Sequence, residues 1–319
     1  MDLRENRYIL AIAKYGSITK AADMLHVTQP ALSKFLMNLE EELGESLFVR
    51  HPKGLTPTLI GEHYLKYARE ISVSHENWKR EYQDLRQETR GRLRIAIPPA
   101  RSSVFIAKVL KPFYERFPDV QVVLHEAANQ AEKFATENGE VDFVIYNCND
   151  PLPGLTYEVL GQEEIVLLAA DQSMLQHVQT RLGAAHPNLP LEAVREEPFI
   201  LQYEDQTTGS ISRNLIRQAG FRPRVLLETR SSEVAMQMAA AGLGLSFVPE
   251  SYLSLLHFDI PPLRFSVGDP CTKVNLCAAY ARGRYLPSYA RFFIGTASKV
   301  FSELCVSQNT VLPGAKWSE

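Results

Sequence analysis

The sequence predicts an α/β chain in which a small helical unit with a β-hairpin is followed by a long helix and two doubly wound α/β halves. Three observations support this fold class. Residues 3–44 show helical apolar spacing broken by short turns, and residues 58–90 form one long run without proline. From residue 91 onwards, short apolar strands alternate with helices, which is typical of a parallel sheet with right-handed crossovers.

Length, charge and cysteine content narrow the class of protein. At 319 residues the chain is long enough for two or three separate cores. Residues 1–90 carry 13 basic and 13 acidic side chains, so bulk charge does not indicate nucleic-acid binding. We expect no membrane span and no signal peptide, because no run of about 18 apolar residues occurs, and hence a cytoplasmic location. The four cysteines lack disulfide or zinc spacing and are expected to be structural thiols, with a redox sensor as the alternative.

The first unit is expected to contain three helices. Residues 3–15 form an apolar-periodic helix that Gly16 ends, and residues 17–44 read as two helices joined by a tight turn. Ser17 and Thr28 are the expected caps, and Gly44 is the expected left-handed stop. The third helix has Pro30 in its first turn and should bury its apolar side chains, which are Ala31, Leu32, Leu36, Leu39 and Leu43.

The third helix is suited to lie in a groove of DNA. Its polar residues Gln29, Ser33, Lys34 and Asn38 stay on the outer face. Residues 47–58 then read as two short strands around a Pro-Lys-Gly turn. This hairpin places Arg50 and Lys53 where a projecting wing would meet phosphates.

A long helix is expected from a cap at Thr58 to about Arg90. Its apolar residues follow alternating four- and three-residue steps, which is typical of a coiled-coil seam and favours a dimer of two copies. The alternative is a long surface helix packed on its own domain. The residues of this seam are Ile60, Tyr64, Tyr67, Ile71, Trp78 and Leu85.

The remainder repeats one order of elements twice. Each half has a strand, a loop, a helix, a strand, a helix and a strand, with the strands at 93–97, 120–125 and 143–146 and then at 199–201, 224–228 and 245–248. Further strands near 164–169 and 274–280 suggest that the chain crosses twice between the halves. Residues 287–304 read as a closing helix, and residues 306–319 as a flexible tail.

A ligand is expected between the two halves, beyond the carboxyl ends of their strands. Each half has a hydroxyl-rich loop at a helix N-terminus, where a carboxylate or another anion binds well. Helix capping is the alternative role for these hydroxyls, and solvent exposure for the arginines. The candidates are Ser102, Ser103, Thr207, Thr208 and Ser210, then Arg101 and Arg230, and, more weakly, Asn129, Gln130 and Asn147.

No nucleophile elbow, phosphate-binding loop or zinc-protease motif occurs, so we expect no enzyme, no metal and no cofactor. Two rival interpretations stay open. An enzyme with a fused DNA-binding head would turn over its ligand. A sensor that no longer binds DNA would show no salt-dependent operator binding.

Several stretches of the sequence match one known family. They are Ala21-Ala22, 28–34, 39–44, 47–50 and Gly61, and then 117–120, 139–143 and 240–244. The first group closely resembles the winged helix-turn-helix of LysR-type transcriptional regulators, and the second resembles the effector domain of that family. Position 35 is usually polar in the family. Phe35 here suits an apolar contact to a thymine methyl group or simple packing.

The resemblance implies a transcriptional regulator controlled by a small-molecule effector. It implies a dimer through the linker helix, a homotetramer of dimers, double-stranded DNA as a partner and a role for RNA polymerase. The expected domains are a DNA-binding domain at 1–58, a linker helix at 59–90 and a type II periplasmic-binding-protein-like effector domain at 91–305. The subdomains of the effector domain are 91–161 with 268–305, and 162–267.

The resemblance also assigns residues to the two sites. DNA contacts fall on Thr28, Gln29, Pro30, Ser33, Lys34 and Arg50, to which the exposed pattern adds Asn38 and Lys53. The effector loops fall on 99–103 and 202–208. The expected effector residues are Pro99, Arg101, Ser102, Ser103, Asn129, Gln202, Thr207, Thr208 and Arg230.

Overall fold

A computed structural model describes residues 3–52, 54–86, 90–126, 141–170, 172–178 and 186–308. The chain divides into two compact units, Met1–Gln87 and Glu88–Glu319, and each is described by itself. The finer domain boundaries expected from the sequence stay a prediction.

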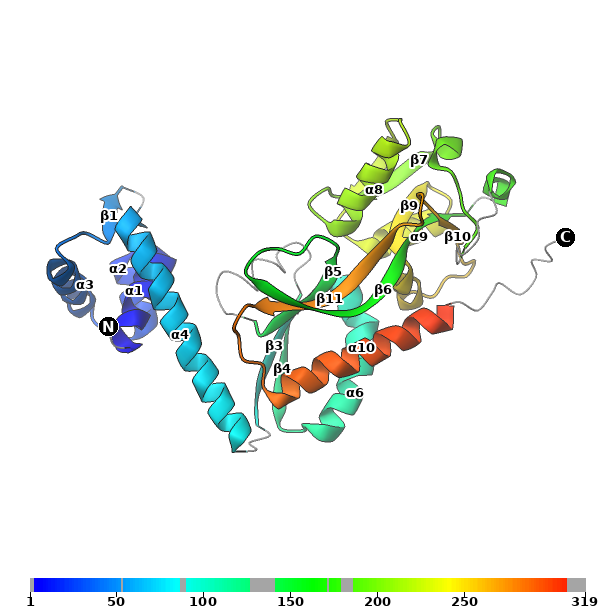
Figure 1. The fold of residues 1–319 in the computed structure, drawn as a ribbon. Helices are drawn as coiled ribbons and strands as arrows, with labels where there is room; N and C mark the ends of the chain where they lie inside the picture. The colour runs from blue at the N-terminus through cyan, green and yellow to red at the C-terminus, as the bar shows by residue number, and fades with distance from the viewer. Residues whose placement is uncertain are drawn as a thin grey trace. The chain divides into compact units, whose positions relative to one another are not determined.

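Three helices open the first unit, as predicted: α1 (Leu3–Tyr15), α2 (Ile18–Leu25) and α3 (Gln29–Leu43) (Figure 1). Gly16 and Gly44 end α1 and α3 with φ angles of 57° and 71°, a conformation that glycine adopts without strain. The Ser17 hydroxyl caps α2 by accepting from the Lys20 N–H at 3.3 Å. These local signals therefore predict the helix ends correctly.

Two expectations for α3 are wrong. Thr28 occupies the N-cap position, but its side chain makes no capping hydrogen bond. Leu32 and Leu36 are buried as expected, whereas Ala31 and Leu43 are exposed. Ala31 lies on the flank of the helix, about 100° round from Leu32, and Leu43 lies in the last turn, next to the Gly44 cap.

The predicted hairpin is formed by β1 (Phe48–His51) and β2 (Gly54–Pro57), which pair antiparallel. It leads into α4 (Leu59–Leu85), and the Thr58 hydroxyl caps this helix by accepting from the Gly61 N–H at 2.9 Å. The helix ends at Leu85, five residues before the expected end.

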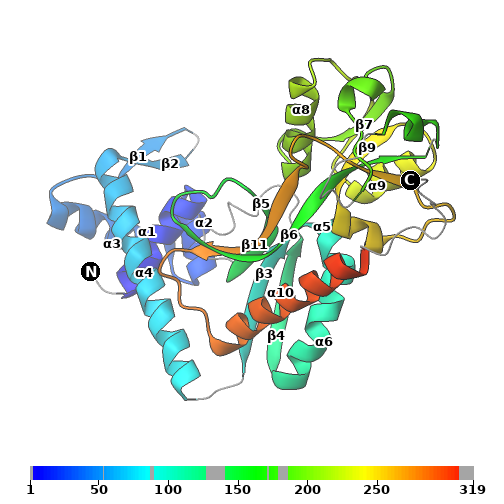
Figure 2. The same cartoon turned by 45° about the vertical axis from the view of Figure 1, so that its right-hand side comes forward.

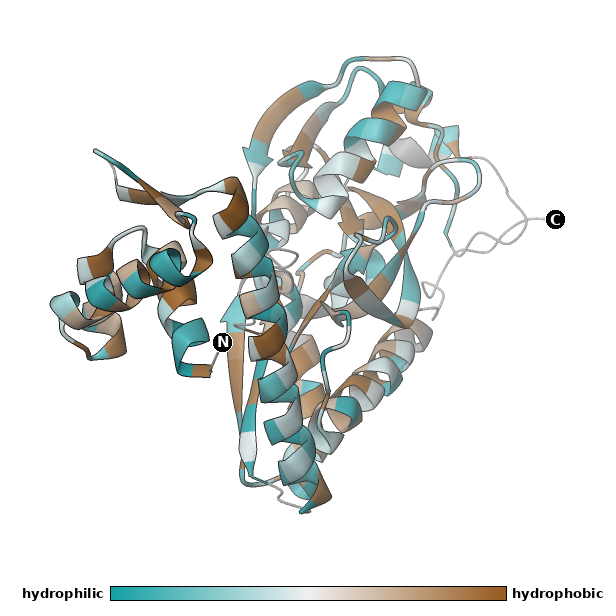
Figure 3. Ribbon diagram, turned by 60° about the vertical axis from the view of Figure 1, so that its left-hand side comes forward, coloured by the Kyte–Doolittle hydropathy of each residue, from teal (hydrophilic) through white to brown (hydrophobic). Residues whose placement is uncertain are grey.

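The beginning of α4 packs on the first unit, and the rest does not. Leu65 and Ala68 are buried in the core of the unit, and Tyr64 packs against that core. The remaining seam residues are exposed on this single copy of the chain, and Figure 3 shows apolar positions along the helix. These exposed seam residues are Ile60, Tyr67, Ile71, Trp78 and Leu85.

The second unit is built on one hydrogen-bonded run of strands in the order β4-β3-β5-β11-β6-β9-β7-β8, with β10 also paired to β6. Strands β3, β4 and β5 pair parallel, as do β7, β8 and β9, whereas the pairs that involve β11 or β6 are antiparallel. The strands are β3 (Gly91–Ile97), β4 (Val120–Glu126), β5 (Phe143–Cys148), β6 (Leu155–Ala169), β7 (Pro198–Gln202), β8 (Arg224–Thr229), β9 (Leu245–Pro249), β10 (Leu263–Ser266) and β11 (Lys273–Ala281).

Helices cover both groups of parallel strands. They are α5 (Pro99–Arg101), a π-turn at Ser102–Ile106 and α6 (Ala107–Arg116) in the first half, α8 (Thr207–Gln218) and α9 (Ser232–Ala240) in the second, and the closing α10 (Ser288–Gln308). Figure 2 shows α10 beside α6, and the rings of Phe113 and Phe293 meet there at 5.4 Å between centroids. The end of the chain therefore completes the core of the first half. Short 3-10 helices occur at Gln172–His177, Leu191–Val194 and Glu250–Leu255.

Three expectations in this unit need correction, and one strand was not expected. The effector loop expected at 99–103 is helical from Pro99, because proline suits the first turn of a helix. Strand β6 begins at Leu155, not near 164, since pairing with β11 extends it. Strand β10 was not predicted. Helix α10 runs to Gln308, into the expected tail. The rest of that tail and the helix expected between β4 and β5 lie outside the described residues.

Candidate functional site

The outer face of α3 carries the residues expected to contact DNA. Gln29, Pro30, Lys34 and Asn38 are exposed, as is Thr28 just before the helix, and Ser33 is half-buried. The opposite face is anchored by the buried Leu32 and Leu36. The packing thus leaves a polar stripe, including Lys34, exposed on the outer face of the helix.

The hairpin is held against the end of α3 by one carboxylate. Glu40 accepts from the backbone N–H groups of Leu47 at 2.6 Å and Phe48 at 3.1 Å. Arg50 is exposed on β1, and Lys53 lies outside the described residues. These hydrogen bonds therefore fix the position of the hairpin, which carries Arg50, relative to α3.

Phe35 packs within the unit. Its ring meets the ring of Tyr8 edge to face, with 5.2 Å between centroids, and it lies against the core cluster. Of the two roles left open for this position, the structure supports packing.

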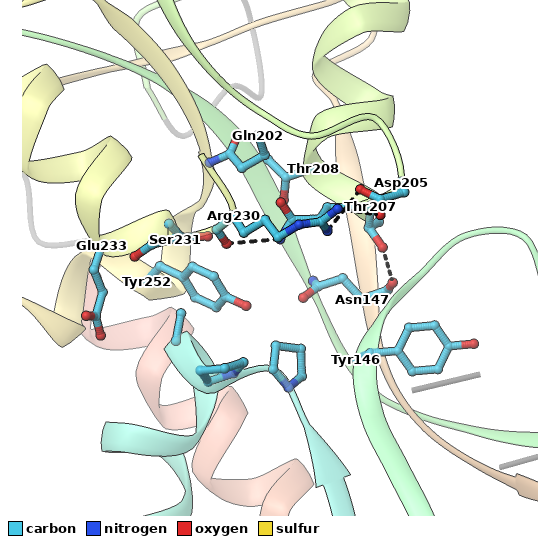
Figure 4. Close-up of a pocket in the computed structure, with 15 residues that line it drawn as sticks. Tyr146, Asn147, Gln202, Asp205, Thr207, Thr208, Arg230, Ser231, Glu233 and Tyr252 are labelled. Atoms are coloured by element: carbon cyan, nitrogen blue, oxygen red, sulfur yellow. Dashed lines mark hydrogen bonds and ion pairs between the residues drawn. The ribbon is translucent and has the colours of Figure 1, made fainter. Parts of the chain in front are cut away.

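The second unit contains a pocket of about 400 Å³. It lies at the carboxyl ends of β5, β7 and β8 and at the first turns of α5, α8 and α9 (Figure 4). The lining residues are Pro98, Pro99, Ala100, Tyr146, Asn147, Gln202, Asp205, Gln206, Thr207, Thr208, Arg230, Ser231, Ser232, Glu233 and Tyr252.

Five of the nine expected effector residues line this pocket: Pro99, Gln202, Thr207, Thr208 and Arg230. Asn147, a weaker candidate, also lines it. Asn129 and Gln130 lie outside the described residues. Arg101, Ser102, Ser103 and Ser210 do not line the pocket.

Arg101 instead forms a buried ion pair. Its guanidinium lies 2.6 Å from Glu163 and donates to Asn147 at 2.8 Å and to Ser251 at 3.1 Å. It also lies over the ring of Tyr252, at 4.7 Å from the centroid. Burial is the largest single influence and disfavours the charge, but Glu163 and Tyr252 together outweigh it and raise the pKa of Arg101 above its ordinary value. The predicted ligand contact is thus corrected to a structural role.

The two serines that follow Arg101 are also engaged elsewhere. The Ser102 hydroxyl donates to the Glu126 carboxylate, and the Ser103 hydroxyl donates to the Ala100 carbonyl at 3.4 Å. Both lie inside the continuous helical run that begins at Pro99, beyond its first turn. The helix therefore uses these hydroxyls locally and does not present them to the pocket.

Arg230 and Asp205 form a two-point ion pair at the pocket wall, with distances of 3.2 and 3.0 Å. The guanidinium lies over the ring of Tyr203, at 4.6 Å from the centroid, and the Gln206 amide donates to the Arg230 carbonyl at 3.1 Å. These contacts hold the Arg230 guanidinium near the N-terminus of α8 (Figure 4).

Two features of the wall come from the first half of the unit. The Thr207 hydroxyl donates to the Asn147 carbonyl at 3.1 Å, which links the start of α8 to the end of β5. The Tyr146 hydroxyl bonds to Tyr157 at 3.2 Å, and its ring points away from the other lining side chains in Figure 4. Burial and this bond raise the pKa of Tyr146 well above its ordinary value.

The sequence interpretation missed several lining residues. Ser231, Ser232 and Glu233 follow β8 just as Thr207 follows β7, so the repeat of strand, loop and helix could have identified them. Tyr252 had no such signal, because it comes from a 3-10 helix that the sequence pattern did not predict.

Two further kinds of site are absent from the described residues. None of their helices is both long and apolar enough to cross a membrane. They also contain no group of three or more His, Cys, Asp or Glu side chains arranged to hold a metal ion.

Comparisons with known proteins agree with this architecture. The model of the LysR substrate-binding domain matches residues 86–302, and the model of the bacterial regulatory helix-turn-helix protein of the lysR family matches residues 3–62. The uncharacterized HTH-type transcriptional regulator YcgK of Bacillus subtilis (strain 168) is 30% identical over 78% of this chain and 80% of its own length.

Solved structures share the fold at low sequence identity. A full-length variant of OxyR from Pseudomonas aeruginosa is 21% identical, with a TM-score of 0.68 over 93% of this chain and 94% of that one. Full-length CbnR in complex with its target DNA is 20% identical, with a TM-score of 0.56 over 94% of this chain and 100% of that one.

Proposed function

Because the chain belongs to the LysR family of bacterial transcriptional regulators, we propose that it binds operator DNA through α3 and the β1–β2 hairpin and that a small molecule in the Thr207–Arg230 pocket controls this binding. The observation that carries the proposal is the exposed polar stripe of α3 beside Arg50. The residues assigned to DNA are Thr28, Gln29, Pro30, Ser33, Lys34, Asn38, Arg50 and Lys53.

Two copies of α3 read two successive major grooves. Gln29, Ser33 and Lys34 lie near base edges, while Arg50 and Lys53 neutralise phosphates. Each copy alone binds weakly, because residues 1–90 have no excess of positive charge. CbnR, which shares this fold, was solved on its target DNA and supports the same use of the first unit here.

The two copies are joined by α4. Its exposed apolar residues extend from Ile60 to Leu85, and burying them against a second α4 removes them from water. We place two such dimers in a tetramer in the cytoplasm, with RNA polymerase as a further partner. The operator then has two-fold symmetry.

The effector acts by binding one arrangement of the unit better than another. The pocket supports this role, since Asn147 and Thr207 come from opposite halves of the unit and meet at its wall. An anionic group on the ligand suits the first turn of α8. We assign no catalytic step to the pocket, so a bound ligand is released unchanged.

The experiment is DNA binding by the full chain. A fragment from upstream of its own gene is titrated and followed by fluorescence anisotropy, with the wild type and the Ser33→Ala/Lys34→Ala double variant. The double variant should lose at least about tenfold in affinity, because it removes a base-edge donor and a cation. Lys79→Ala on α4 is the matched control and should bind normally. Wild-type affinity in the double variant would refute the assignment.

Two further readouts accompany this titration. The sedimentation of the double variant should match the wild type, because α4 is intact. Wild-type affinity should fall steeply as salt rises. Chemical conversion of a bound ligand would instead favour an enzyme with a fused DNA-binding head.

A further inference from the structure

The charges that line the pocket do not suit a simple anion. Among the described lining residues, Arg230 is the one cation, and Asp205 and Glu233 are carboxylates, so the wall has a net charge of one minus two, or −1. Arg230 is moreover already paired with Asp205. A ligand that carries only a carboxylate would add a second negative charge to a wall that already carries one in excess.

Glu233 is the unbalanced charge. Its side chain is exposed to solvent and forms no ion pair or hydrogen bond with a described residue, whereas Arg230 is held by Asp205. In the view of Figure 4, Tyr252 lies between Glu233 and the Asp205–Arg230 pair. The pocket therefore has a negative side that is separate from its arginine.

A buried acceptor in the wall also lacks a donor. Gln202 is 1% exposed and donates its amide N–H to the Phe247 carbonyl at 3.1 Å, but its Oε1 has no partner among the described residues. The Oε1 of Gln206 is also buried and likewise has no hydrogen-bond partner among the described residues. Leaving a buried acceptor unpaired is unfavourable, so the ligand is expected to bring an N–H or O–H group.

The opposite requirement holds at the first turn of α8. Gln206 is its N-cap residue and makes no side-chain capping bond, so the amides of that turn lack the usual acceptor. The neighbouring α9 differs, because the Ser231 hydroxyl caps it by accepting from the Val234 N–H at 3.2 Å. An anionic oxygen of the ligand is therefore expected at α8, beside Thr208 and Arg230.

We propose that the effector is a zwitterion of the amino-acid class. Its carboxylate accepts from the first turn of α8 beside Arg230. Its ammonium group donates to Gln202 Oε1 and is attracted by Glu233. This proposal rests on the effector role given to the pocket above. A zwitterion adds no net charge to the wall, and it supplies both the acceptor and the donor that the wall lacks.

The test uses the full chain and three matched ligand series. Each of the common L-amino acids is compared with its N-acetyl derivative, which keeps the carboxylate and loses the cation, and with its amide, which keeps the cation and loses the carboxylate. Binding is measured by thermal shift and then by titration calorimetry. At least one amino acid should raise the Tm, and both of its derivatives should bind at least about tenfold more weakly.

Two outcomes would overturn the proposal. One is that no amino acid in the series raises the Tm. The other is that either derivative binds as tightly as the amino acid: an equally tight N-acetyl derivative would show that the ammonium group is not recognised, and an equally tight amide would show that the carboxylate is not.

A pair of variants tests whether Glu233 is the residue that recognises the ammonium group. Glu233→Gln should reduce the preference for the amino acid over its N-acetyl derivative by about tenfold, because it removes the charge that attracts the ammonium. Glu192→Gln removes an exposed carboxylate that does not line this pocket and should leave the preference unchanged. An unchanged preference in Glu233→Gln would contradict the assignment.

Operator binding separates this inference from the proposed function. If the full chain binds its operator but does not discriminate between the ligand series, the proposal of a zwitterionic effector is wrong, and the proposed function as a DNA-binding regulator still holds. If the chain does not bind operator DNA at all, the proposed function itself is wrong, whatever the ligand series shows.

Discussion

The guanidinium of Arg101 lies 2.6 Å from a carboxylate oxygen of Glu163, and neither side chain is more than 2% exposed. Asn147 donates to the same oxygen at 2.8 Å, and the Ser251 N–H donates to the other at 3.0 Å. Arg101 belongs to α5, Glu163 to β6 and Ser251 to a 3-10 helix of the second half. The ion pair therefore joins elements that are distant in the chain, directly behind the pocket wall.

This pair predicts a double-mutant cycle. Glu163→Gln and Arg101→Met should each lower the free energy of unfolding by about 3 kcal/mol, because each leaves a buried charge without its partner. The double variant Arg101→Met/Glu163→Gln should be much less destabilised than the sum of the two. Urea unfolding followed by circular dichroism measures all three. Simple additivity would show that the two charges do not interact.

Arg101 also shows why part of the site could not be predicted. Its place after Pro98-Pro99 predicted a position at the ligand pocket, and Pro99 does line the pocket, whereas Arg101 does not. The difference is made by Glu163 and Ser251, which are 62 and 150 residues away in the sequence. Burial of a charge depends on such distant partners, and no local pattern reports them.

Local signals were sufficient elsewhere. Ser17, Pro30 and Gly44 act within a few residues of their own position, and so the start of α2 and both ends of α3 were predicted. The length of β6 was not, because its first ten residues are held by pairing with β11, more than a hundred residues later. The repeated loop-helix pattern found Thr207 and Thr208 for the same local reason.

Gly61 predicts a steric limit at the joint between the hairpin and α4. A Cβ at this position would lie 2.0 Å from the Leu47 carbonyl oxygen, a backbone atom that cannot move aside cheaply. Gly61→Ala should therefore destabilise the first unit by about 2 kcal/mol, the usual cost of overpacking. The Tm of the full chain and its operator affinity should both fall.

The matched control is Gly295→Ala, also within a helix. Nothing lies within 4 Å of the added Cβ there, so the substitution should be neutral or stabilising by up to about 1 kcal/mol. Equal stability of the two variants would mean that the close approach at Leu47 is not maintained in solution.

Trp78 predicts the strength of the proposed dimer. It is 58% exposed on α4, where its ring stacks between those of His75 and Tyr82 at 5.8 and 5.7 Å. Trp78→Ala should weaken self-association by about 2 kcal/mol, or roughly thirtyfold, as expected for an aromatic anchor of an interface. Analytical ultracentrifugation across a dilution series measures the change.

The control for Trp78 lies on the same helix. Glu76→Ala removes an exposed ion pair with Lys79, which contributes little. If Trp78→Ala and Glu76→Ala associate equally well, the seam is not the dimer contact, and α4 is the surface helix of the alternative interpretation.

We expect the thiols of Cys277 and Cys305 to react slowly with a disulfide reagent. Burial raises the pKa of Cys277 to about 11, and the neighbouring Cys148 adds to this, while burial also raises the pKa of Cys305 to about 11. Since the thiolate is the reactive form, both should be labelled slowly by a disulfide reagent at pH 8 in the folded chain. Mass spectrometry of timed samples identifies the sites, and rapid labelling of Cys277 would favour the redox-sensor alternative.

Glu164 predicts how stability changes with pH. Burial raises the pKa of its carboxyl above the ordinary value, and Glu250 adds to this, whereas Ser266, His186 and Lys273 act in the opposite sense but do not cancel it. The folded chain therefore holds a proton on Glu164 more firmly than the unfolded chain does. The stability contributed by this group is complete below its unfolded pKa and is lost as the pH rises through the folded pKa.

Glu164→Gln removes the charge and keeps the shape. The variant should be more stable than the wild type at pH 8, and this advantage should shrink as the pH falls, because the carboxyl of wild-type Glu164, whose pKa is raised, progressively takes up its proton. Urea unfolding at pH 5, 6, 7 and 8 measures the trend, with the exposed Glu192→Gln as a control that should show none. A loss of stability at pH 8 would mean that Lys273 and His186 favour the charged form of Glu164 more strongly than burial disfavours it.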